Sequence, residues 1–172
     1  MKSIGLFYGS LTGNTKSVAD EIASKLGGMK IELYDVGQCR ADAMAACDYL
    51  IIGTPTWGEG ELQKDWKAFV RHLDTAGLSS KTVALFGLGD QAHFGDRFLN
   101  AMGTLYDRVT SCGATVVGGW PTDDYAFDDS TAVRNGEFVG LAIDEVNQHD
   151  LTSERITRWI ELIAPYFMKK AA

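Results

Sequence analysis

The chain has 172 residues, of which 19 are glycine and only 3 are proline, and its formal net charge is −7. This length favours a single domain over residues 1–172, which can bury about 70% of its unfolded surface without disulfides or metals. An acidic balance argues against nucleic acid and anionic membrane surfaces as partners. No apolar stretch reaches the ~18 residues that a membrane span requires, so we expect no membrane insertion.

The three cysteines, Cys39, Cys47 and Cys112, are widely spaced and form no C-x-x-C motif. No histidine lies at metal-ligand spacing from them, so they indicate reduced thiols and no metal site. An apolar strand pattern begins almost at the first residue, without the pattern of a secretory signal. We therefore expect a cytoplasmic protein.

Apolar runs predict five strands, at residues 3–8, 30–34, 49–54, 82–87 and 114–117. The third run is continuously apolar, which is typical of a central parallel strand covered on both faces. Between and after the strands, apolar spacing predicts helices. The first starts near Asn14 and ends at Gly27 and Gly28, a weaker one spans 41–46, and a third carries apolar positions 66, 69, 70 and 73. A fourth carries apolar positions 98, 102, 105 and 109, and the last follows Thr152.

Alternating strands and helices predict an α/β three-layer sandwich, in which a parallel sheet carries helices on both faces. Five such strands usually wind in the order 2-1-3-4-5, and a ligand then lies at the carboxyl ends of strands one, three and four. Residues 118–140 fit neither a strand nor a helix, so we expect an insertion in or after strand five.

The first of the three loops at that edge runs from Gly9 to Thr15, between strand and helix, and is typical of phosphate binding through backbone N–H groups. It is rich in small polar donors, namely Ser10, Thr12, Asn14 and Thr15. A nucleoside triphosphate loop would need a lysine that is missing here. The pattern therefore predicts a site for one terminal phosphate, and the alternative is a serine-rich turn without a ligand.

The other two loops each carry an aromatic residue among glycines and acids. Residues 54–62 include Trp57, and residues 87–98 include Phe94. Two loop aromatics above a phosphate site suggest a flat ring held between them. The alternative is that both side chains merely close the top of the sheet.

Acidic residues are concentrated in the segment 121–150, which holds eight acids and one base, Arg134. The rest of the chain holds 15 acids and 15 bases and is neutral. An acidic face favours fast, salt-sensitive docking to a basic protein surface. The alternative is a solubilising surface without a partner.

These loops, together with residues 136–142 at the end of the insertion, resemble flavodoxins of the long-chain type. The resemblance covers the whole chain, in order and at the right spacings. It implies a flavodoxin-like fold and an electron carrier without a catalytic site. It also implies non-covalently bound FMN as the cofactor, which passes single electrons at low potential to partner redox proteins.

Carried over position by position, the resemblance assigns the FMN phosphate to Ser10, Leu11, Thr12, Gly13, Asn14 and Thr15. The second loop would contribute Thr54, Pro55, Thr56, Trp57, Gly58, Glu59 and Gly60. The third would contribute Leu88, Gly89, Asp90, Phe94, Asp96 and Arg97. Within these sets, Trp57 and Phe94 would cover the two ring faces.

In the family, the peptide after the tryptophan flips and turns its carbonyl toward flavin N5, which favours the neutral semiquinone. Gly58 makes that flip inexpensive because it reaches positive φ without a Cβ clash. Four carboxylates near the ring would oppose the anionic hydroquinone and so lower the second potential. They are Glu59, Glu61, Asp90 and Asp96.

The chain departs from the family pattern at Phe94, where tyrosine is usual, and at His93, where glycine is frequent. Stacking should survive the first change. His93 is expected to be a solvent-exposed loop residue, and the alternative is a cation that makes the flavin potential pH-dependent. Arg97 adds a second positive charge, which would weaken the acidic opposition to the hydroquinone.

The resemblance implies a ferredoxin/flavodoxin–NADP reductase as electron donor and a monomeric carrier. Nitrogenase, photosystem I and radical-enzyme activation systems are the acceptors that it allows. The enzymatic alternative is a flavodoxin-like NAD(P)H-dependent quinone reductase, which needs an open flavin face. Coverage by both Trp57 and Phe94 argues against it.

Overall fold

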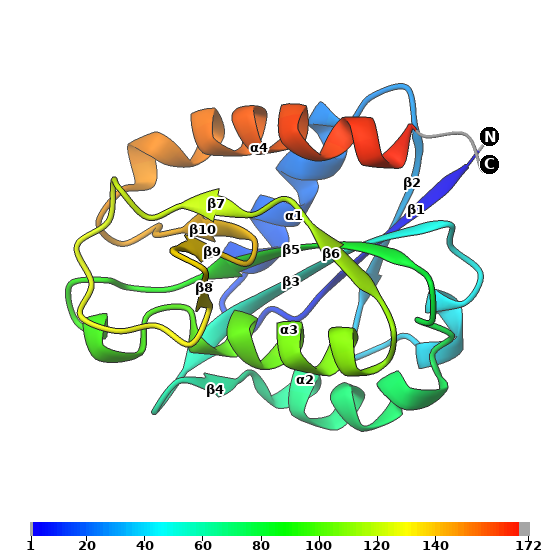
Figure 1. Ribbon diagram of the computed structural model, residues 1–172, viewed down its shortest axis with the longest axis horizontal. Helices are drawn as coiled ribbons and strands as arrows, with labels where there is room; N and C mark the ends of the chain where they lie inside the picture. The colour runs from blue at the N-terminus through cyan, green and yellow to red at the C-terminus, as the bar shows by residue number, and fades with distance from the viewer. Residues whose placement is uncertain (1, 169–172) are drawn as a thin grey trace.

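Five parallel strands form the central layer of the fold in the computed structural model, which describes residues 2–168 (Figure 1). Their order is β10-β5-β3-β1-β2, and every neighbouring pair is parallel. Along the sheet they are Leu141–Ile143 (β10), Thr82–Leu88 (β5), Tyr49–Trp57 (β3), Ser3–Tyr8 (β1) and Lys30–Asp35 (β2). The predicted fold class and winding order are confirmed.

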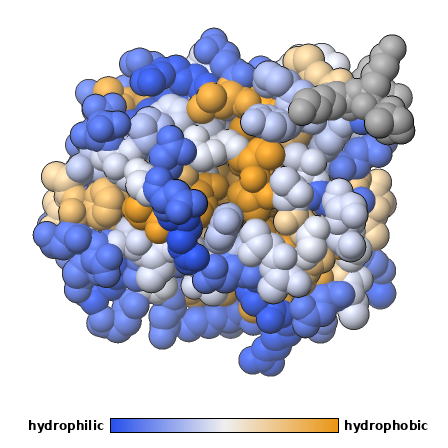
Figure 2. Space-filling view, in the orientation of Figure 1, coloured by the Kyte–Doolittle hydropathy of each residue, from blue (hydrophilic) through white to orange (hydrophobic). Residues whose placement is uncertain are grey.

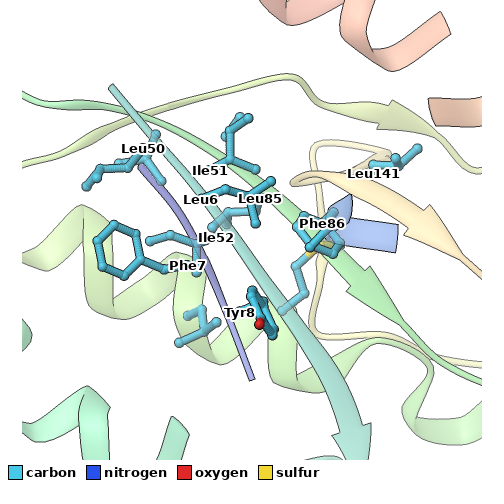
Figure 3. Packing of buried hydrophobic residues seen from close by; sticks show 14 of the residues in the cluster. Leu6, Phe7, Tyr8, Leu50, Ile51, Ile52, Leu85, Phe86 and Leu141 are labelled. Atoms are coloured by element: carbon cyan, nitrogen blue, oxygen red, sulfur yellow. The ribbon is translucent and has the colours of Figure 1, made fainter. Parts of the chain in front are cut away.

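The core lies on both faces of the three central strands. Leu6 of β1, Ile51 of β3 and Leu85 of β5 are completely buried, and Figure 3 shows their side chains packed closely together. Such strands are covered on both sides and so need apolar residues at successive positions. The register pairs Tyr8 of β1 with Gly53 of β3, and Gly53 with Phe86 of β5. The carboxyl ends of the strands therefore meet at one edge of the sheet.

Helices cover both faces of this sheet (Figure 1). On one side lie Asn14–Lys25 (α1) and Thr152–Phe167 (α4), and on the other lie Lys64–Phe69 (α2) and Asn100–Ser111 (α3). Short 3₁₀ segments span Ala41–Met44 (η1), Val70–Thr75 (η2), Gly95–Arg97 (η3) and His149–Leu151 (η4). The predicted helices thus all have counterparts, the weakest of them as a 3₁₀ turn.

Phe98, the first residue of the apolar pattern that predicts the fourth helix, lies outside that helix. Leu99 adopts a left-handed conformation with φ of 60°, and α3 begins only at Asn100. Phe98 therefore precedes the helix, and its ring lies 5.7 Å from that of Phe127 and 5.8 Å from that of Phe138 in the insertion. Apolar spacing identified a buried residue here but could not reveal the change of backbone direction.

The insertion divides the fifth strand into two pieces. Residues Thr115–Val117 (β6) pair with the beginning of β5, and β10 pairs with its end. Between them, a small antiparallel sheet is formed by Trp120–Pro121 (β7), Val133–Arg134 (β8) and Glu137–Phe138 (β9). The expected insertion in or after strand five therefore interrupts the strand.

A hairpin replaces part of the second predicted loop. Strand β3 continues beyond the predicted end at residue 54 to Trp57, where it pairs in antiparallel fashion with Glu61–Leu62 (β4). Placing Trp57 in an irregular loop was therefore wrong, because it is the last residue of a strand. The hairpin fixes the position of its side chain relative to the sheet edge.

Hydrophobic residues on the face drawn in Figure 2 form separate patches, with hydrophilic residues around the periphery. Within residues 2–168, no helix is both long enough and apolar enough to cross a bilayer.

Candidate functional site

The loop after β1 leads directly into the N-terminus of α1. Gly13 precedes the helix with φ of 93°, and Ser10 Oγ accepts a hydrogen bond from its N–H at 3.1 Å. Among the described residues, no side chain caps α1 and no acid occupies its first turn. The first N–H groups of this helix are thus free to bind an anion, which the helix dipole also favours.

The position of Gly9 shows how tightly this loop is packed against the rest of the site. A Cβ atom there would lie 2.5 Å from Oε1 of Gln63 and 2.6 Å from the ring of Trp66. Only glycine fits such a space without displacing its neighbours. Gly9 therefore brings β1 and α2 together beneath the loop.

The β3–β4 hairpin forms one wall of the site, which we call the Trp57 rim (residues 54–62). Gly58 and Gly60 have φ of 49° and 90°, and the N–H of Gly60 donates to the Trp57 carbonyl at 3.1 Å. A Cβ at Gly58 would approach only Glu61, at 3.9 Å. Glycine at position 58 is thus required by backbone conformation, and steric crowding plays no part.

The opposite wall is the segment after β5, which we call the Phe94 rim (residues 88–97). The Asp90 carboxylate accepts hydrogen bonds from the N–H groups of Ala92 and His93, at 3.1 and 3.0 Å, and from the amide of Asn147 at 2.9 Å. It also pairs with Nδ1 of His93 at 2.8 Å. Burial acts to raise the pKa of Asp90, but these hydrogen bonds outweigh it and leave the pKa lowered.

A completely buried carboxylate, Asp144, anchors the Phe94 rim from behind. It accepts hydrogen bonds from the backbone and side chain of Gln91, at 3.0 and 2.8 Å, and from the N–H groups of Val146 and Asn147. Asp144 is one of the eight acids of the segment 121–150, and the prediction that this segment forms an acidic face is wrong for this residue. The reason is that its oxygen atoms satisfy buried donors, so it does not face solvent.

A cavity of about 300 Å³ lies between the two rims and the phosphate loop. Of the 19 residues predicted to bind the cofactor, 13 line this cavity, and they come from three separate loops. These residues are Leu11, Thr12, Asn14, Thr15, Pro55, Thr56, Trp57, Gly58, Leu88, Gly89, Asp90, Phe94 and Arg97. Its volume is at the lower end of the range for small-molecule sites.

The other predicted residues do not line this cavity; they are Ser10, Gly13, Thr54, Glu59, Gly60 and Asp96. Most support its walls. The Thr54 side chain is buried, and its hydroxyl donates to the Pro55 carbonyl at 2.9 Å. Glu59 forms an ion pair with Arg97 across the two rims.

Three lining residues were missed by the sequence analysis, namely Phe98, Glu145 and Val146. The last two follow β10, the second half of the divided strand. Glu145 pairs with His149 at 2.7 Å and accepts a hydrogen bond from the Thr152 hydroxyl. The Glu145 interaction raises the pKa of His149. A short apolar run at 141–143 was the available signal that another strand ends beside the site.

The two exposed aromatic side chains face the same cavity from opposite rims. Trp57 is 38% exposed and Phe94 is 47% exposed, which is high for large apolar groups. The guanidinium carbon of Arg97 lies 5.5 Å from the centre of the Phe94 ring. This arrangement can hold a flat, largely apolar ring that carries a phosphate on a flexible tail.

The flavodoxin family model matches residues 6–159. The chain belongs to the flavodoxin family. Flavodoxin of Picosynechococcus sp. is 49% identical over 168 residues, which cover 97% of this chain and 99% of that protein. Flavodoxin 1 of Azotobacter vinelandii is 43% identical and covers 98% and 99% of the two chains.

Solved flavodoxin structures agree with this membership. The crystal structure of Fusobacterium nucleatum flavodoxin bound to flavin mononucleotide has a TM-score of 0.92 and 37% identity. The match covers 97% of this chain and 99% of that one. The resemblance to flavodoxins is thereby confirmed over nearly the full length.

Proposed function

We propose that this flavodoxin is a low-potential one-electron carrier that binds FMN non-covalently. In this proposal, FMN moves between the oxidised, neutral semiquinone and anionic hydroquinone states and passes electrons to partner redox proteins. The cavity between the uncapped start of α1 and two exposed aromatic rings carries the proposal. The F. nucleatum flavodoxin, solved with flavin mononucleotide, supports the choice of cofactor.

The FMN phosphate would be held at the start of α1. The donors there are neutral, because Thr12, Asn14 and Thr15 line the cavity and, among the described residues, no basic side chain lines it on this side. Backbone N–H groups at the helix start supply directed donors, and the dipole supplies a partial positive charge. Such a set suits a single phosphate better than a polyphosphate, which needs added cations.

The isoalloxazine ring would lie between Trp57 and Phe94. Stacking contributes about 0.5–1.5 kcal/mol per aromatic pair beyond the burial of apolar area. The carboxylate of Asp90 already accepts several internal hydrogen bonds, so its part in binding would be to shape the rim. Backbone groups of Gly89 and Arg97 are the remaining candidates for polar contacts with the ring edge.

Gly58 would control the first reduction step. Gly58 already has a positive φ. Because it carries no Cβ atom, the peptide that follows it can rotate without a steric clash. The Trp57 carbonyl is held by the N–H of Gly60, which leaves the Gly58 carbonyl as the group free to turn toward the ring. The chain itself would thus offer an acceptor for one proton at the cofactor.

Acidic groups would lower the potential of the second reduction step, but by less than their number suggests. Glu59 and Asp96 both lie beside Arg97, whose charge offsets theirs. Glu145, which lines the cavity, adds a carboxylate that the sequence analysis did not consider. The low second potential would therefore depend on Asp90 and Glu145 and on exclusion of water by the two rings.

Stepwise dithionite reduction of the purified, FMN-loaded protein tests the proposal through its visible spectrum. A yellow protein that turns blue after one electron, and becomes pale only with a much stronger reductant, is the expected result. Direct bleaching by two electrons, with steady NADPH oxidation by the protein alone, would favour the quinone reductase. Protein that is colourless after incubation with FMN and removal of the unbound cofactor would refute flavin binding.

As partners we propose a ferredoxin/flavodoxin–NADP reductase as electron donor and low-potential proteins as electron acceptors. We also propose that the carrier is a single-domain monomer and that it acts in the cytoplasm. An exposed acidic patch supports an electron donor whose docking surface is basic. It consists of Asp123, Asp124, Asp128 and Asp129. This patch adjoins the Phe94 rim, because the carbonyl of Gly95 accepts hydrogen bonds from the N–H groups of Asp128 and Asp129. Replacing these four acids by their amides should slow association with the reductase at low salt, and an unchanged rate would exclude the patch.

A further inference from the structure

A second groove borders the Trp57 rim and lies next to the cofactor cavity. It has a volume of about 480 Å³ and runs between the phosphate loop, the β3–β4 hairpin and α2. We call it the α2 groove. The side chains that give it its character are Leu11, Trp57, Glu61, Lys64, Lys67 and Arg71.

The α2 groove is basic, although the protein as a whole is acidic. Lys64, Lys67 and Arg71 are exposed and follow one another at three- and four-residue steps along α2 and η2, which places them on one face. Glu61 is the one carboxylate among the lining residues, and it pairs with Lys67 at 2.5 Å. Within residues 2–168, Lys64 and Arg71 form no ion pair.

The α2 groove also shares its apolar wall with the cofactor cavity. Leu11 and Trp57 line both spaces, and Leu11 is 68% exposed. An occupant of the groove would therefore touch the side chain that borders the cavity. This combination of two apolar groups and three cations matches a segment that carries both an apolar side chain and carboxylates.

We propose that the α2 groove docks an acidic segment of a redox partner, with an apolar side chain of that segment against Leu11 and Trp57. The proposal rests on the electron-carrier function, and it assigns the carrier two docking surfaces of opposite charge. The acidic patch beside the Phe94 rim would meet a basic partner, and the α2 groove would meet an acidic one. Donor and acceptor could thus be distinguished by charge.

Two other occupants fit the groove less well. An inorganic anion would use the cations but leave Leu11 exposed to water. The acidic segment of a second copy would build a dimer, a closed ring or an open chain of carriers, whereas we propose a carrier that acts as a monomer. A partner segment uses both kinds of side chain and ends the contact at one molecule.

The test is an NMR titration of the FMN-loaded, ¹⁵N-labelled protein with the capped peptide Glu-Glu-Leu-Glu-Glu. Shifts are expected at residues 61–71 and at the Trp57 indole, and binding should weaken between about 0.05 and 0.3 M salt. Two control peptides separate the contributions: glutamine in place of every glutamate should abolish binding, and serine in place of leucine should weaken it.

A matched pair of charge-reversal variants locates the site. The double variant Lys64→Glu/Arg71→Glu should weaken peptide binding by about tenfold or more. The control Lys30→Glu/Arg40→Glu changes the net charge equally at exposed residues outside the groove, and it should stay within about twofold. Visible absorbance of the same samples reports FMN, so loss of the cofactor is seen separately from loss of docking.

Three results would overturn the proposal. Equal weakening by both double variants would mean that net charge alone attracts the peptide. Inorganic phosphate that competes at the same residues with the same affinity would reduce the α2 groove to a general anion site. Concentration-dependent self-association that Lys64→Glu/Arg71→Glu abolishes would assign the groove to a second copy of the chain.

Discussion

The two rims of the cofactor cavity are held in place in different ways. The Trp57 rim is a short hairpin, and its shape depends on two glycines with positive φ, on the pairing of β3 with β4 and on a hydrogen bond from Gly60 to Trp57. The Phe94 rim is fixed by buried side chains, because Gln91 and Asp144 join it to β10 and to the insertion. A rim set by local geometry can change conformation alone, whereas a rim set by a buried network moves only when that network breaks.

The largest effect is expected from removing the buried carboxylate behind the Phe94 rim. Asp144→Ala leaves the donors of Gln91, Val146 and Asn147 without an acceptor, and it should lower the free energy of unfolding by about 3 kcal/mol. Urea unfolding at pH 7 measures this change. The exposed Asp123→Ala variant is the control and should stay within about 0.5 kcal/mol. A loss of less than about 1 kcal/mol for Asp144→Ala would mean that the network does not hold this rim.

The next effect concerns the Trp57 rim. Gly58→Ala places a Cβ on a residue with φ of 49°, and it should cost about 1 kcal/mol of stability through backbone strain alone. Gly58→Asn should cost less, because asparagine tolerates this conformation. Unfolding experiments give the stability, and the potential of the first reduction step shows whether the turn is coupled to the cofactor. Equal free energies of unfolding for the wild type and Gly58→Ala would show that the positive φ of Gly58 causes no strain in alanine.

A smaller effect is expected at the bridge between the rims. The Arg97 side chain is 23% exposed, lines the cavity and lies over the Phe94 ring, whereas its partner Glu59 is 81% exposed. Arg97→Ala should therefore weaken FMN binding several-fold through lost packing. Glu59→Gln should change it by less than about twofold, because an exposed ion pair contributes little. Fluorescence titration with FMN compares the two, and equal losses would show that charge dominates over packing.

The smallest effect is a pH dependence of the Phe94 rim. The pKa of Asp90 is lower in the folded protein than its ordinary value, so the carboxylate stabilises the fold above about pH 4. That stabilisation disappears as the pH falls through the lowered pKa. Urea unfolding from pH 5 to pH 3 should therefore show a shallower loss for Asp90→Asn than for the wild type. Parallel curves would exclude Asp90 as the titrating group.

Much of the fold could be predicted from the sequence, because continuous apolar runs marked the strands and glycines marked their ends. The predicted strand 3–8 coincides with β1, and the start of α1 at Asn14 was also correct. Both features depend on local patterns of burial and on turn chemistry. The extension of β3 to Trp57 was missed because it depends on pairing with β4, which is two residues long.

The site was predicted less completely where it depends on contacts between distant segments. The phosphate loop is one continuous motif, and four of its six predicted residues line the cavity, namely Leu11, Thr12, Asn14 and Thr15. Glu145 and Val146 were missed because β10 has three residues and follows an insertion, so its carboxyl end could not be assigned to the site edge. The role of Asp144 was also hidden, since a buried carboxylate and a surface carboxylate look alike in a sequence.

The different environments of the four tryptophans provide an intrinsic optical probe. Trp66, Trp120 and Trp159 are at most 3% exposed, and Trp57 is 38% exposed. In the cofactor-free protein, the long-wavelength part of the emission should come from Trp57. A ring that stacks on that indole would quench this part most strongly. Emission at the red edge could therefore follow cofactor loading and α2 groove occupancy in the unlabelled protein.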